Sequence, residues 1–293
     1  MGQAQLASGM TVISIQSQVA YGHVGNSAAV FPMQARGIEV VAVPTTLLSN
    51  RPGYSTVRGK ILEADLVADL LVGIEERGAL DSCQIVLSGY LGSAEIAEVV
   101  AGFVTRAKKA NPRLIYCCDP VIGDSDRGLF VPSSLPPLFR DVLCPMADII
   151  TPNHFEFDWL CGKRSTATDD LIANAHCLLA GGLSTVVVTS VETADRPADV
   201  IETVAVERSS AWRLRTPQLP IRPSGTGDLF AALLVASLAR GAAIETALGE
   251  AVSGTFAVLE RTAAAGTEEM QIIQAAPLLS HPHHRFAATA IRG

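Results

Sequence analysis

The chain carries the stretch Pro223-Ser224-Gly225-Thr226-Gly227-Asp228-Leu229-Phe230, which opens onto a long apolar segment at residues 229–238. Glycines let the backbone turn freely and approach a ligand closely. The free N–H groups at a helix N-terminus, together with the positive end of the helix dipole, attract anions such as phosphate. The pattern therefore predicts a glycine-rich, anion-binding loop that leads into a buried helix, with Asp228 beside any anion held there.

These eight residues alone favour an ordinary helix cap over a catalytic centre, because Asp is a common N-cap and short motifs match by chance. They also fail two known phosphate-binding patterns. Phe230 stands where G-x-G-x-x-G needs its third glycine, and the chain contains no G-x-x-x-x-G-K-[ST]. The function therefore has to be argued from the rest of the sequence.

Composition narrows the class of protein. The chain has 293 residues, 48% of them hydrophobic, which suffices for one large domain or two small ones. The net charge is −7 and there is no basic block, so we expect no nucleic-acid partner. No apolar run approaches the roughly 18 residues that cross a bilayer, so we expect no membrane partner. The six cysteines show no C-x-x-C spacing and predict reduced, mostly buried thiols in a cytoplasmic protein.

Apolar, β-branched runs alternate with helical patterns along most of the chain. Strands are expected at residues 11–17, 38–45, 84–88, 113–119, 147–151 and 185–190. Helices are expected at residues 26–36, 63–77, 94–110, 138–143, 153–161, 169–179, 228–240 and 244–263. This alternation predicts an α/β fold with a doubly wound, mostly parallel central sheet and helices on both faces.

Residues 200–216 change to an alternating pattern, which predicts an antiparallel hairpin at the edge of the sheet. The sequence shows no linker or repeat, so a single domain is expected over residues 11–280. Residues 1–10 are expected to be a flexible extension. Residues 281–293, which include three histidines and Phe286, are expected to be a solvated C-terminal tail, with Phe286 as its one candidate for docking onto the domain.

Polar residues follow every predicted parallel strand. Ligands of such sheets bind at the carboxyl ends of the strands. Those ends carry Ser17, residues 50–54, Gly89-Tyr90, residues 119–124, residues 151–153 and Thr189-Ser190. Each of these is an ordinary turn residue by itself. Because all of them fall on one edge of one sheet, together with residues 225–228, they predict a site there.

Two carboxylates on this edge are candidate ligands for Mg²⁺, which takes hard oxygens and commonly combines one or two carboxylates with substrate phosphates. Asp119 follows a strand, and Glu156 lies in the first turn of a predicted helix. Taken singly, they are better explained as a turn residue and a residue that stabilises the helix dipole. No lysine or arginine is an obvious phosphate clamp. Residues 124–128 are suited to a mobile flap.

The chain resembles the pyridoxal kinases of the ribokinase-like superfamily over residues 12–260. The G-T-G-D element marks the superfamily, and the segment from Ile15, combined with S-N and S-G-Y, is more specific to the vitamin B6 branch. The matching segments are Ile15-Gln16-Ser17-Gln18-Val19-Ala20-Tyr21-Gly22, Val24-Gly25-Asn26-Ser27-Ala28, Leu47-Leu48-Ser49-Asn50, Leu87-Ser88-Gly89-Tyr90-Leu91-Gly92, Asp119-Pro120-Val121-Ile122-Gly123-Asp124, Ile150-Thr151-Pro152-Asn153, Phe155-Glu156, Val188-Thr189-Ser190 and Gly225-Thr226-Gly227-Asp228-Leu229-Phe230.

The resemblance implies roles for the matching positions. Asp228 would be the catalytic base, with Gly225, Thr226 and Gly227 forming the anion loop. Asp119 and Glu156 would organise Mg²⁺, with K⁺ or another monovalent cation nearby. The substrate would contact Ser17, Asn50, Arg51, Gly53, Tyr90 and Asp228. ATP would contact Asp124, Thr151, Glu156, Thr189, Ser190, Gly225 and Gly227. The family is usually homodimeric.

One segment departs from the family, whose members usually carry a histidine just after S-N. Here the loop reads Ser49-Asn50-Arg51-Pro52-Gly53-Tyr54, so Arg51 or Gly53 takes that place. The departure concerns the contact with the substrate ring and leaves the phosphate chemistry untouched.

Three hypotheses follow. The first is ATP-dependent phosphorylation of the 5′-hydroxymethyl group of pyridoxal, and of pyridoxine and pyridoxamine, in B6 salvage. The second is a hydroxymethylpyrimidine kinase of thiamin biosynthesis, to which the missing histidine gives weight and against which the S-G-Y segment counts. The third is a non-catalytic protein that binds B6 or a nucleotide, which would have no need of the carboxylates Asp119, Glu156 and Asp228.

Overall fold

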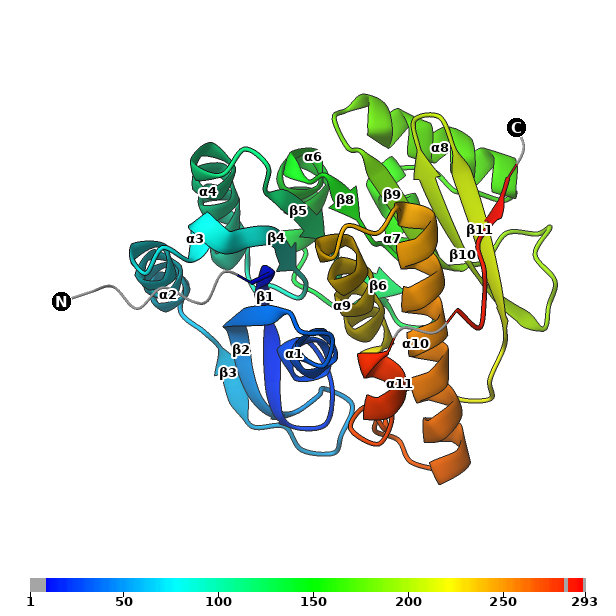
Figure 1. Cartoon of the computed structure of the whole chain (residues 1–293), viewed down its shortest axis with the longest axis horizontal. Coiled ribbons are helices and arrows are strands. Elements are labelled where there is room, and N and C mark those ends of the chain that lie inside the picture. The colour runs from blue at the N-terminus through cyan, green and yellow to red at the C-terminus, as the bar shows by residue number, and fades with distance from the viewer. Residues whose placement is uncertain (1–8, 282–283, 292–293) are drawn as a thin grey trace.

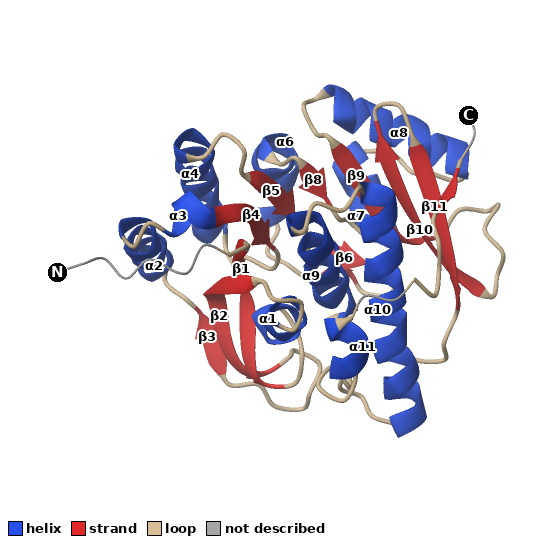
Figure 2. Cartoon of the chain, in the orientation of Figure 1, coloured by secondary structure: helices blue, strands red, loops and turns tan. Residues whose placement is uncertain are grey.

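The computed structural model describes residues 9–281 and 284–291 of the chain. These residues form a central sheet with the strand order β12-β11-β10-β9-β8-β5-β4-β1-β2-β3, and helices cover both of its faces (Figures 1 and 2). The strands of this sheet are β1 (Thr11–Tyr21), β2 (Glu39–Asn50), β3 (Gly59–Ile61), β4 (Cys83–Ser88), β5 (Ile115–Cys118), β8 (Ile149–Ile150), β9 (Thr185–Val191), β10 (Val200–Glu207), β11 (Ala211–Pro217) and β12 (Thr289–Ala290).

The helices lie mostly between successive parallel strands. They are α1 (Asn26–Gln34), α2 (Ala64–Glu76), α3 (Ala79–Ser82), α4 (Ala94–Ala110), α5 (Leu135–Leu138), η1 (Phe139–Leu143), α6 (Cys144–Met146), α7 (His154–Cys161), α8 (Thr168–Ala180), α9 (Thr226–Ala239), α10 (Ile244–Ala265) and α11 (Ala276–Ser280). Strands β2, β1, β4, β5, β8 and β9 pair in parallel in that order. Both edges of the sheet are antiparallel, through β3 on one side and β10, β11 and β12 on the other. The predicted fold class and the edge hairpin at residues 200–216 are therefore confirmed.

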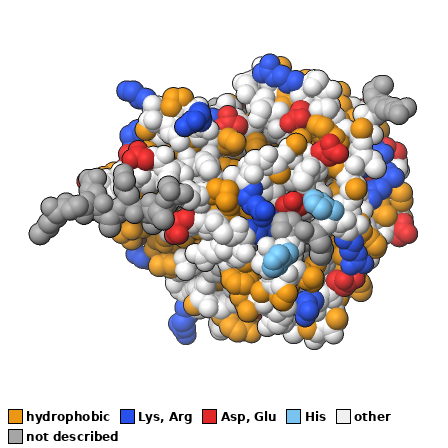
Figure 3. Space-filling model, viewed as in Figure 1, with side chains coloured by type: hydrophobic (Ala, Val, Ile, Leu, Met, Phe, Trp, Pro, Cys, Tyr) orange, Lys and Arg blue, Asp and Glu red, His pale blue; other side chains and the backbone are white. Residues whose placement is uncertain are grey.

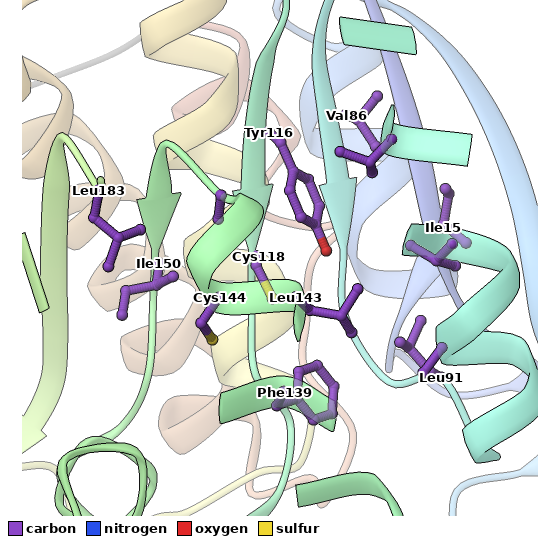
Figure 4. Packing of buried hydrophobic residues seen from close by; sticks show 14 of the residues in the cluster. Ile15, Val86, Leu91, Tyr116, Cys118, Phe139, Leu143, Cys144, Ile150 and Leu183 are labelled. Carbon is purple, nitrogen blue, oxygen red and sulfur yellow. The ribbon is translucent and has the colours of Figure 1, made fainter. Parts of the chain in front are cut away.

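Both faces of the sheet are buried, which explains the almost continuous apolar strands. Along β9, Val186 and Val188 pack into the core that contains α2, α4 and α8, whereas Val187 packs into the core formed with α9 and α10. Figure 4 shows part of the first core, where Cys118, Cys144 and Tyr116 lie among aliphatic side chains. The Tyr116 hydroxyl satisfies its hydrogen-bonding capacity there with Ser88 Oγ at 2.8 Å.

The elements that the sequence did not predict are all short. They are β3, α3, α11, β12 and a small hairpin formed by β6 (Gly123–Asp124) and β7 (Gly128–Leu129). The helix expected at residues 138–143 belongs to a longer helical segment, in which η1 is a π-helical turn between α5 and α6.

The C-terminal segment packs against the domain. The Phe286 ring makes an edge-to-face contact with Phe256 at 5.0 Å between centroids, and its backbone N–H donates to Ser253 Oγ at 3.1 Å. Strand β12 then pairs with Trp212 and Arg213 of β11. The expected docking of Phe286 is confirmed, and Ala288 also packs against the domain, whereas most residues of the segment 284–291 are exposed, as expected of a solvated tail. The flexible extension expected at residues 1–10 falls almost wholly on residues outside the described part.

The surface agrees with the charge pattern of the sequence. On the face shown in Figure 3, acidic and basic side chains are interspersed rather than gathered by sign. Within residues 9–281 and 284–291, no helix has the length and apolar character needed to cross a membrane.

Candidate active site

The glycine-rich loop meets the sheet edge at the N-terminus of α9, which starts at Thr226 with Gly225 as its N-cap. Gly225 has φ +85°, and a Cβ atom there would lie 2.0 Å from the carbonyl oxygen of His23. The position therefore requires glycine for both conformation and space. Gly227 is exposed, and a Cβ there would meet nothing within 4 Å. The loop is thus packed tightly on one side and open on the other.

Asp228 lies in the first turn of α9 and is partly buried. Its Oδ2 accepts a hydrogen bond from the backbone N–H of Gly25 at 2.8 Å. Desolvation raises the pKa of Asp228 to about 6, and the bond from Gly25 opposes that rise. A carboxylate with a raised pKa at a helix N-terminus is suited to accept a proton near neutral pH.

A cleft of about 520 Å³ opens beside this loop. It brings together all the residues that the sequence assigned to ATP, to the metal and to the anion loop. These are Asp119, Asp124, Thr151, Glu156, Thr189, Ser190, Gly225, Thr226, Gly227 and Asp228. Residues on or directly after the four strands β5, β6, β8 and β9 therefore converge with the first turns of two helices, α7 and α9, on a single space.

Asp119 is buried at the end of β5, where Thr151 Oγ1 donates to its Oδ1 at 3.1 Å. Burial raises the pKa of Asp119 well above its usual range, and the nearby carboxylates of Glu156 and Asp228 raise it further. Three acidic side chains thus crowd one side of the cleft.

Glu156 is buried in the first turn of α7 and shapes the backbone around it. Its Oε1 accepts the N–H groups of Ile122 at 2.8 Å and Gly123 at 3.3 Å, and its Oε2 accepts that of Asn153 at 2.9 Å. Asn153 Oδ1 accepts the Glu156 N–H in return, which completes a capping box. Burial raises the pKa of Glu156 to about 7 against these three bonds. Glu156 therefore holds the segment after Asp119 in place, whatever else it binds.

The acidic cluster fits a magnesium ion that arrives with a nucleotide. No group of three or more His, Cys, Asp or Glu side chains in the described part of the chain forms a ready metal cage. Mg²⁺ does not need one, because it keeps several waters and takes one or two carboxylates with phosphate oxygens. The mutual repulsion that raises the Asp119 pKa is the kind that a bound cation would relieve.

The C-terminal part of β9, which contains Thr189 and Ser190, forms another wall of the cleft. The Thr189 N–H donates to the carbonyl of Pro152 at 2.9 Å, which ties this part of the strand to the start of α7. Ser190 follows with φ +50°, and it is the one non-glycine residue with positive φ among residues 9–281 and 284–291. Backbone strain of this kind is concentrated at functional sites.

The segment expected to be a flap is the β6–β7 hairpin. Asp124 Oδ1 accepts the Arg127 N–H at 2.7 Å within the turn. Ser125 Oγ donates to Glu192 at 3.1 Å, and Asp126 pairs with Arg222, so the hairpin is held from two sides. The sequence offered no obvious phosphate clamp, but the structure places basic side chains at the cleft. The cleft is lined by Arg127, Arg196 and Arg222, which are far apart in the sequence and therefore form no basic motif.

Of the residues assigned to the substrate ring, Ser17 lies within β1, which runs four residues beyond its predicted end, Asn50 ends β2, and Tyr90 follows β4. Ser17 touches the β1–α1 loop, since a Cβ at Gly25 would stand 2.4 Å from Ser17 Oγ. Tyr90 is partly buried, its carbonyl accepts from Thr45 Oγ1 at 2.7 Å, and burial raises the pKa of its phenol. The side-chain amide of Asn50 is held in place, because its Nδ2 donates to the carbonyls of Arg51 at 3.2 Å and Thr56 at 2.9 Å.

The departure from the family pattern has a clear structural outcome. The Arg51 guanidinium lies over the Tyr54 ring at 4.7 Å and donates to Glu269 Oε1 at 3.1 Å. Gly53 has φ +115° and lies against the Arg51 guanidinium. Glu269, which sequence reasoning missed, lies after α10 and offered no signal beyond the Glu-Glu pair of residues 268–269.

Comparison with known proteins identifies the family. The family model described as phosphomethylpyrimidine kinase matches residues 34–272. The pyridoxal kinase PdxY of Leifsonia xyli subsp. xyli is 44% identical over 282 residues, which cover 96% of this chain and all of that protein. The pyridoxal kinase PdxY of Rubrobacter xylanophilus is 46% identical over 279 residues, covering 95% of this chain and 96% of that protein.

Solved structures agree with these relatives. The pyridoxal kinase of Leishmania donovani, in complex with ADP and pyridoxamine, superposes with a TM-score of 0.89 at 30% identity. The match covers 97% of this chain and 100% of that chain. Because both sequence and structure match over almost the whole length, the chain belongs to the pyridoxal kinase family and shares its ribokinase-like fold.

Proposed function

We propose that this protein transfers a phosphoryl group from ATP to the 5′-hydroxymethyl group of pyridoxal, and of pyridoxine and pyridoxamine, giving pyridoxal 5′-phosphate from pyridoxal and the corresponding 5′-phosphates from the other two in vitamin B6 salvage. One observation carries the proposal. Asp228 is held by Gly25 at the junction between the cleft assigned to ATP and the strand ends assigned to the substrate ring. Relatives named pyridoxal kinase, which match 96% and 95% of this chain, support the same activity.

In the proposed reaction, Asp228 accepts the proton of the hydroxymethyl group as its oxygen attacks the γ-phosphorus. The Gly25 N–H fixes Oδ2 of the carboxylate, so the base is oriented before the substrate arrives. The bond between the γ-phosphorus and the bridging oxygen of ATP breaks, and ADP leaves with the negative charge.

The backbone amides at Gly225, Thr226 and Gly227 are placed to stabilise charge on the transferring phosphoryl group, because they lie at the N-terminus of α9. Thr226 Oγ1 donates to the Pro223 carbonyl at 2.9 Å and keeps the loop in this shape. Arginines that line the cleft, Arg222 among them, supply positive charge toward the outer phosphates.

Asp119, with Glu156 directly or through water, would hold Mg²⁺, which when bound neutralises phosphate charge. A monovalent cation such as K⁺ is also part of the proposal, and activity in potassium compared with sodium salts tests it. ATP dependence and the six free thiols support a cytoplasmic location.

A second acceptor, hydroxymethylpyrimidine, is favoured by the description of the matching family model. A panel of pyridoxal, pyridoxine, pyridoxamine and hydroxymethylpyrimidine with MgATP decides between the two functions. We expect kcat/KM for pyridoxal to exceed that for hydroxymethylpyrimidine by at least about a hundredfold, as expected when a pocket recognises polar groups of its substrate. The reverse order would replace the first function with the second, and absence of any phosphorylated product would overturn both.

We also propose that the protein is a homodimer. Strands β1, β2 and β3 expose Tyr21 (63%), Leu47 (46%) and Ile61 (38%), and an association through this edge of the sheet would cover apolar side chains. Sedimentation velocity tests this proposal. The wild type should sediment as a dimer and Leu47→Asp should shift toward the monomer, whereas a monomeric wild type would refute it.

A further inference from the structure

A carboxylate outside the cleft connects the two halves of the site. Glu269 lies in the segment between α10 and α11, and its side chain is only 15% exposed. Its Oε1 accepts from the Tyr54 hydroxyl at 2.7 Å and from Arg51 Nε at 3.1 Å. Its Oε2 accepts from the His23 N–H at 3.1 Å. One side chain thus fixes two loops that are separate in the sequence.

The first of these is the β2–β3 loop, residues 51–58, which follows directly on Asn50. Its bonds to Glu269 come from Arg51 and Tyr54, whose side chains also stack on each other. The guanidinium of Arg51, one of the two candidates for the place of the family's histidine, is thereby turned toward Glu269. Glu269 thus holds the loop in place through an ion pair with Arg51 and a hydrogen bond from the Tyr54 hydroxyl, and the loop contains Arg51 and Gly53, which the resemblance assigns to the substrate.

The second is the β1–α1 loop, residues 22–25. Gly22 has φ +91°, and a Cβ there would stand 2.4 Å from Glu269 Oε2, so the backbone of this loop is pressed against the carboxylate. The carbonyl of His23 lies against Gly225 in the anion loop. Two residues later, the Gly25 N–H donates to Asp228 at 2.8 Å. The link from Glu269 to the base therefore runs through three residues of backbone.

We infer that Glu269 is a positioning residue, which holds the β2–β3 loop against the substrate through Arg51 and Tyr54, and aligns Asp228 through the β1–α1 loop. The inference rests on the proposed function, with Asp228 as the base. It predicts that breaking the contacts of Glu269 with the β2–β3 loop and breaking its contact with the β1–α1 loop change different kinetic parameters. Loss of Arg51 or Tyr54 weakens substrate binding, whereas loss of Glu269 also disturbs the base.

The test is steady-state kinetics of Arg51→Met, Tyr54→Phe and Glu269→Ala with pyridoxal and MgATP. Arg51→Met and Tyr54→Phe should each raise the KM for pyridoxal by roughly tenfold, the effect of one lost charge-assisted hydrogen bond, with kcat within about threefold of wild type. Glu269→Ala should raise the same KM and also lower kcat by at least about tenfold, because the His23 N–H loses its acceptor. The KM for ATP should change little in Arg51→Met and Tyr54→Phe.

Non-additivity gives a second readout. Adding Arg51→Met to Glu269→Ala should raise the KM for pyridoxal no further, since the partner is already absent. Glu268→Ala is the matched control. Glu268 is the neighbouring carboxylate, is 77% exposed and reaches Arg51 only at 3.4 Å, so both parameters should stay within about twofold of wild type.

Thermal melting separates positioning from folding. If Glu269→Ala does not fold, Glu269→Gln replaces it. The Gln oxygen can still accept the His23 N–H, so kcat should be close to wild type while the KM rises. Three results would overturn the inference. They are near-wild-type kinetics of Glu269→Ala, additive effects of Arg51→Met and Glu269→Ala on the KM for pyridoxal, and a loss of kcat alone in Arg51→Met. A wild type that does not phosphorylate pyridoxal would instead overturn the proposed function.

Discussion

The backbone N–H of Gly25 lies 2.8 Å from Oδ2 of Asp228 and joins the first loop of the sheet to the first turn of α9. Oδ1 of Asp228 accepts no hydrogen bond from the described residues. One oxygen of the carboxylate is therefore anchored, and the other is available to a substrate hydroxyl group. The hydrogen bond from Gly25 therefore orients the carboxylate and leaves one of its oxygens able to accept a proton.

Asp228→Asn should lower kcat by roughly a hundredfold to ten-thousandfold, because general-base catalysis contributes on that scale. The amide keeps the size of the side chain, so the affinity for ATP should stay within a few-fold of wild type. Single-turnover kinetics and ATP titration by calorimetry measure the two quantities separately. A variant that turns over at the wild-type rate would remove Asp228 from the role of base.

The pH dependence of the wild-type rate should follow the same carboxylate. Burial raises the pKa of Asp228 to about 6, and only the deprotonated form accepts a proton. We expect kcat to rise with pH through about 6 and to level off above it. The residual rate of Asp228→Asn should lack this rise. A wild-type profile that is flat between pH 5 and pH 7 would contradict the assignment.

The raised pKa of Asp228 also predicts how the stability of the fold depends on pH. The dependence has the opposite sign from that of a salt-bridged Asp, whose pKa is lowered. The pKa of Asp228 is higher in the folded protein than its ordinary value of 3.8, so the folded state binds more protons between that value and about 6. The contribution of this group to the free energy of unfolding therefore falls as pH rises through that window. Asp228→Asn should be more stable than wild type at pH 7.5, by about 1 kcal/mol for a partly exposed group, and equal to it near pH 4. Thermal melts at the two pH values test this, and a lower melting temperature at pH 7.5 would contradict it.

Two glycines of the anion loop should respond differently to alanine. In Gly225→Ala, the new Cβ would collide with the His23 carbonyl in a left-handed backbone, so the free energy of unfolding should fall by roughly 2 kcal/mol or more. In Gly227→Ala, the new Cβ meets no protein atom, so stability should change by less than about 0.5 kcal/mol. Its methyl group lies at the open side of the loop, and we expect the KM for ATP to rise. Chemical denaturation and kinetics measure these effects, and equal destabilisation by both would refute the packing difference.

The Glu156→Gln variant tests whether Glu156 holds the backbone segment after Asp119 in place. A glutamine has one acceptor oxygen, so it cannot serve Ile122 and Gly123 on one side and Asn153 on the other. An unsatisfied buried N–H costs about 1 to 3 kcal/mol, and we expect a loss of that size in the free energy of unfolding together with a raised KM for MgATP. Glu98→Gln, at an exposed position on α4, is the control and should be silent.

The sequence predicted the parts of the fold that local patterns encode. Helices such as α4 and α9 carry their own periodicity and end signals, and the structure has them within two residues of the predicted bounds. The long apolar strands exist where predicted, but β1 and β2 run four and five residues beyond their predicted ends. Strands β3, β6, β7 and β12 have two or three residues each, which is too few for any period. They exist because a neighbouring strand offers free backbone groups, and that is a property of the folded chain.

The site divides in the same way. Residues at strand ends could be placed on one edge from topology alone, and the cleft contains all those assigned to ATP. The partner of Arg51 could not be found this way, because Glu269 is 218 residues distant and lies in a loop without a motif. For the same reason, three separate arginines on the cleft formed no recognisable basic pattern.

Ser190, which lines the cleft, has a strained backbone conformation. Its φ of +50° costs a residue with a side chain roughly 1 kcal/mol, and the neighbouring Thr189 is fixed to Pro152. Glycine would adopt the same backbone conformation without that cost but would lose the hydroxyl group. Position 190 therefore separates the backbone conformation of the cleft wall from its chemistry, and a gain in thermal stability in Ser190→Gly would measure the strain that the serine side chain imposes.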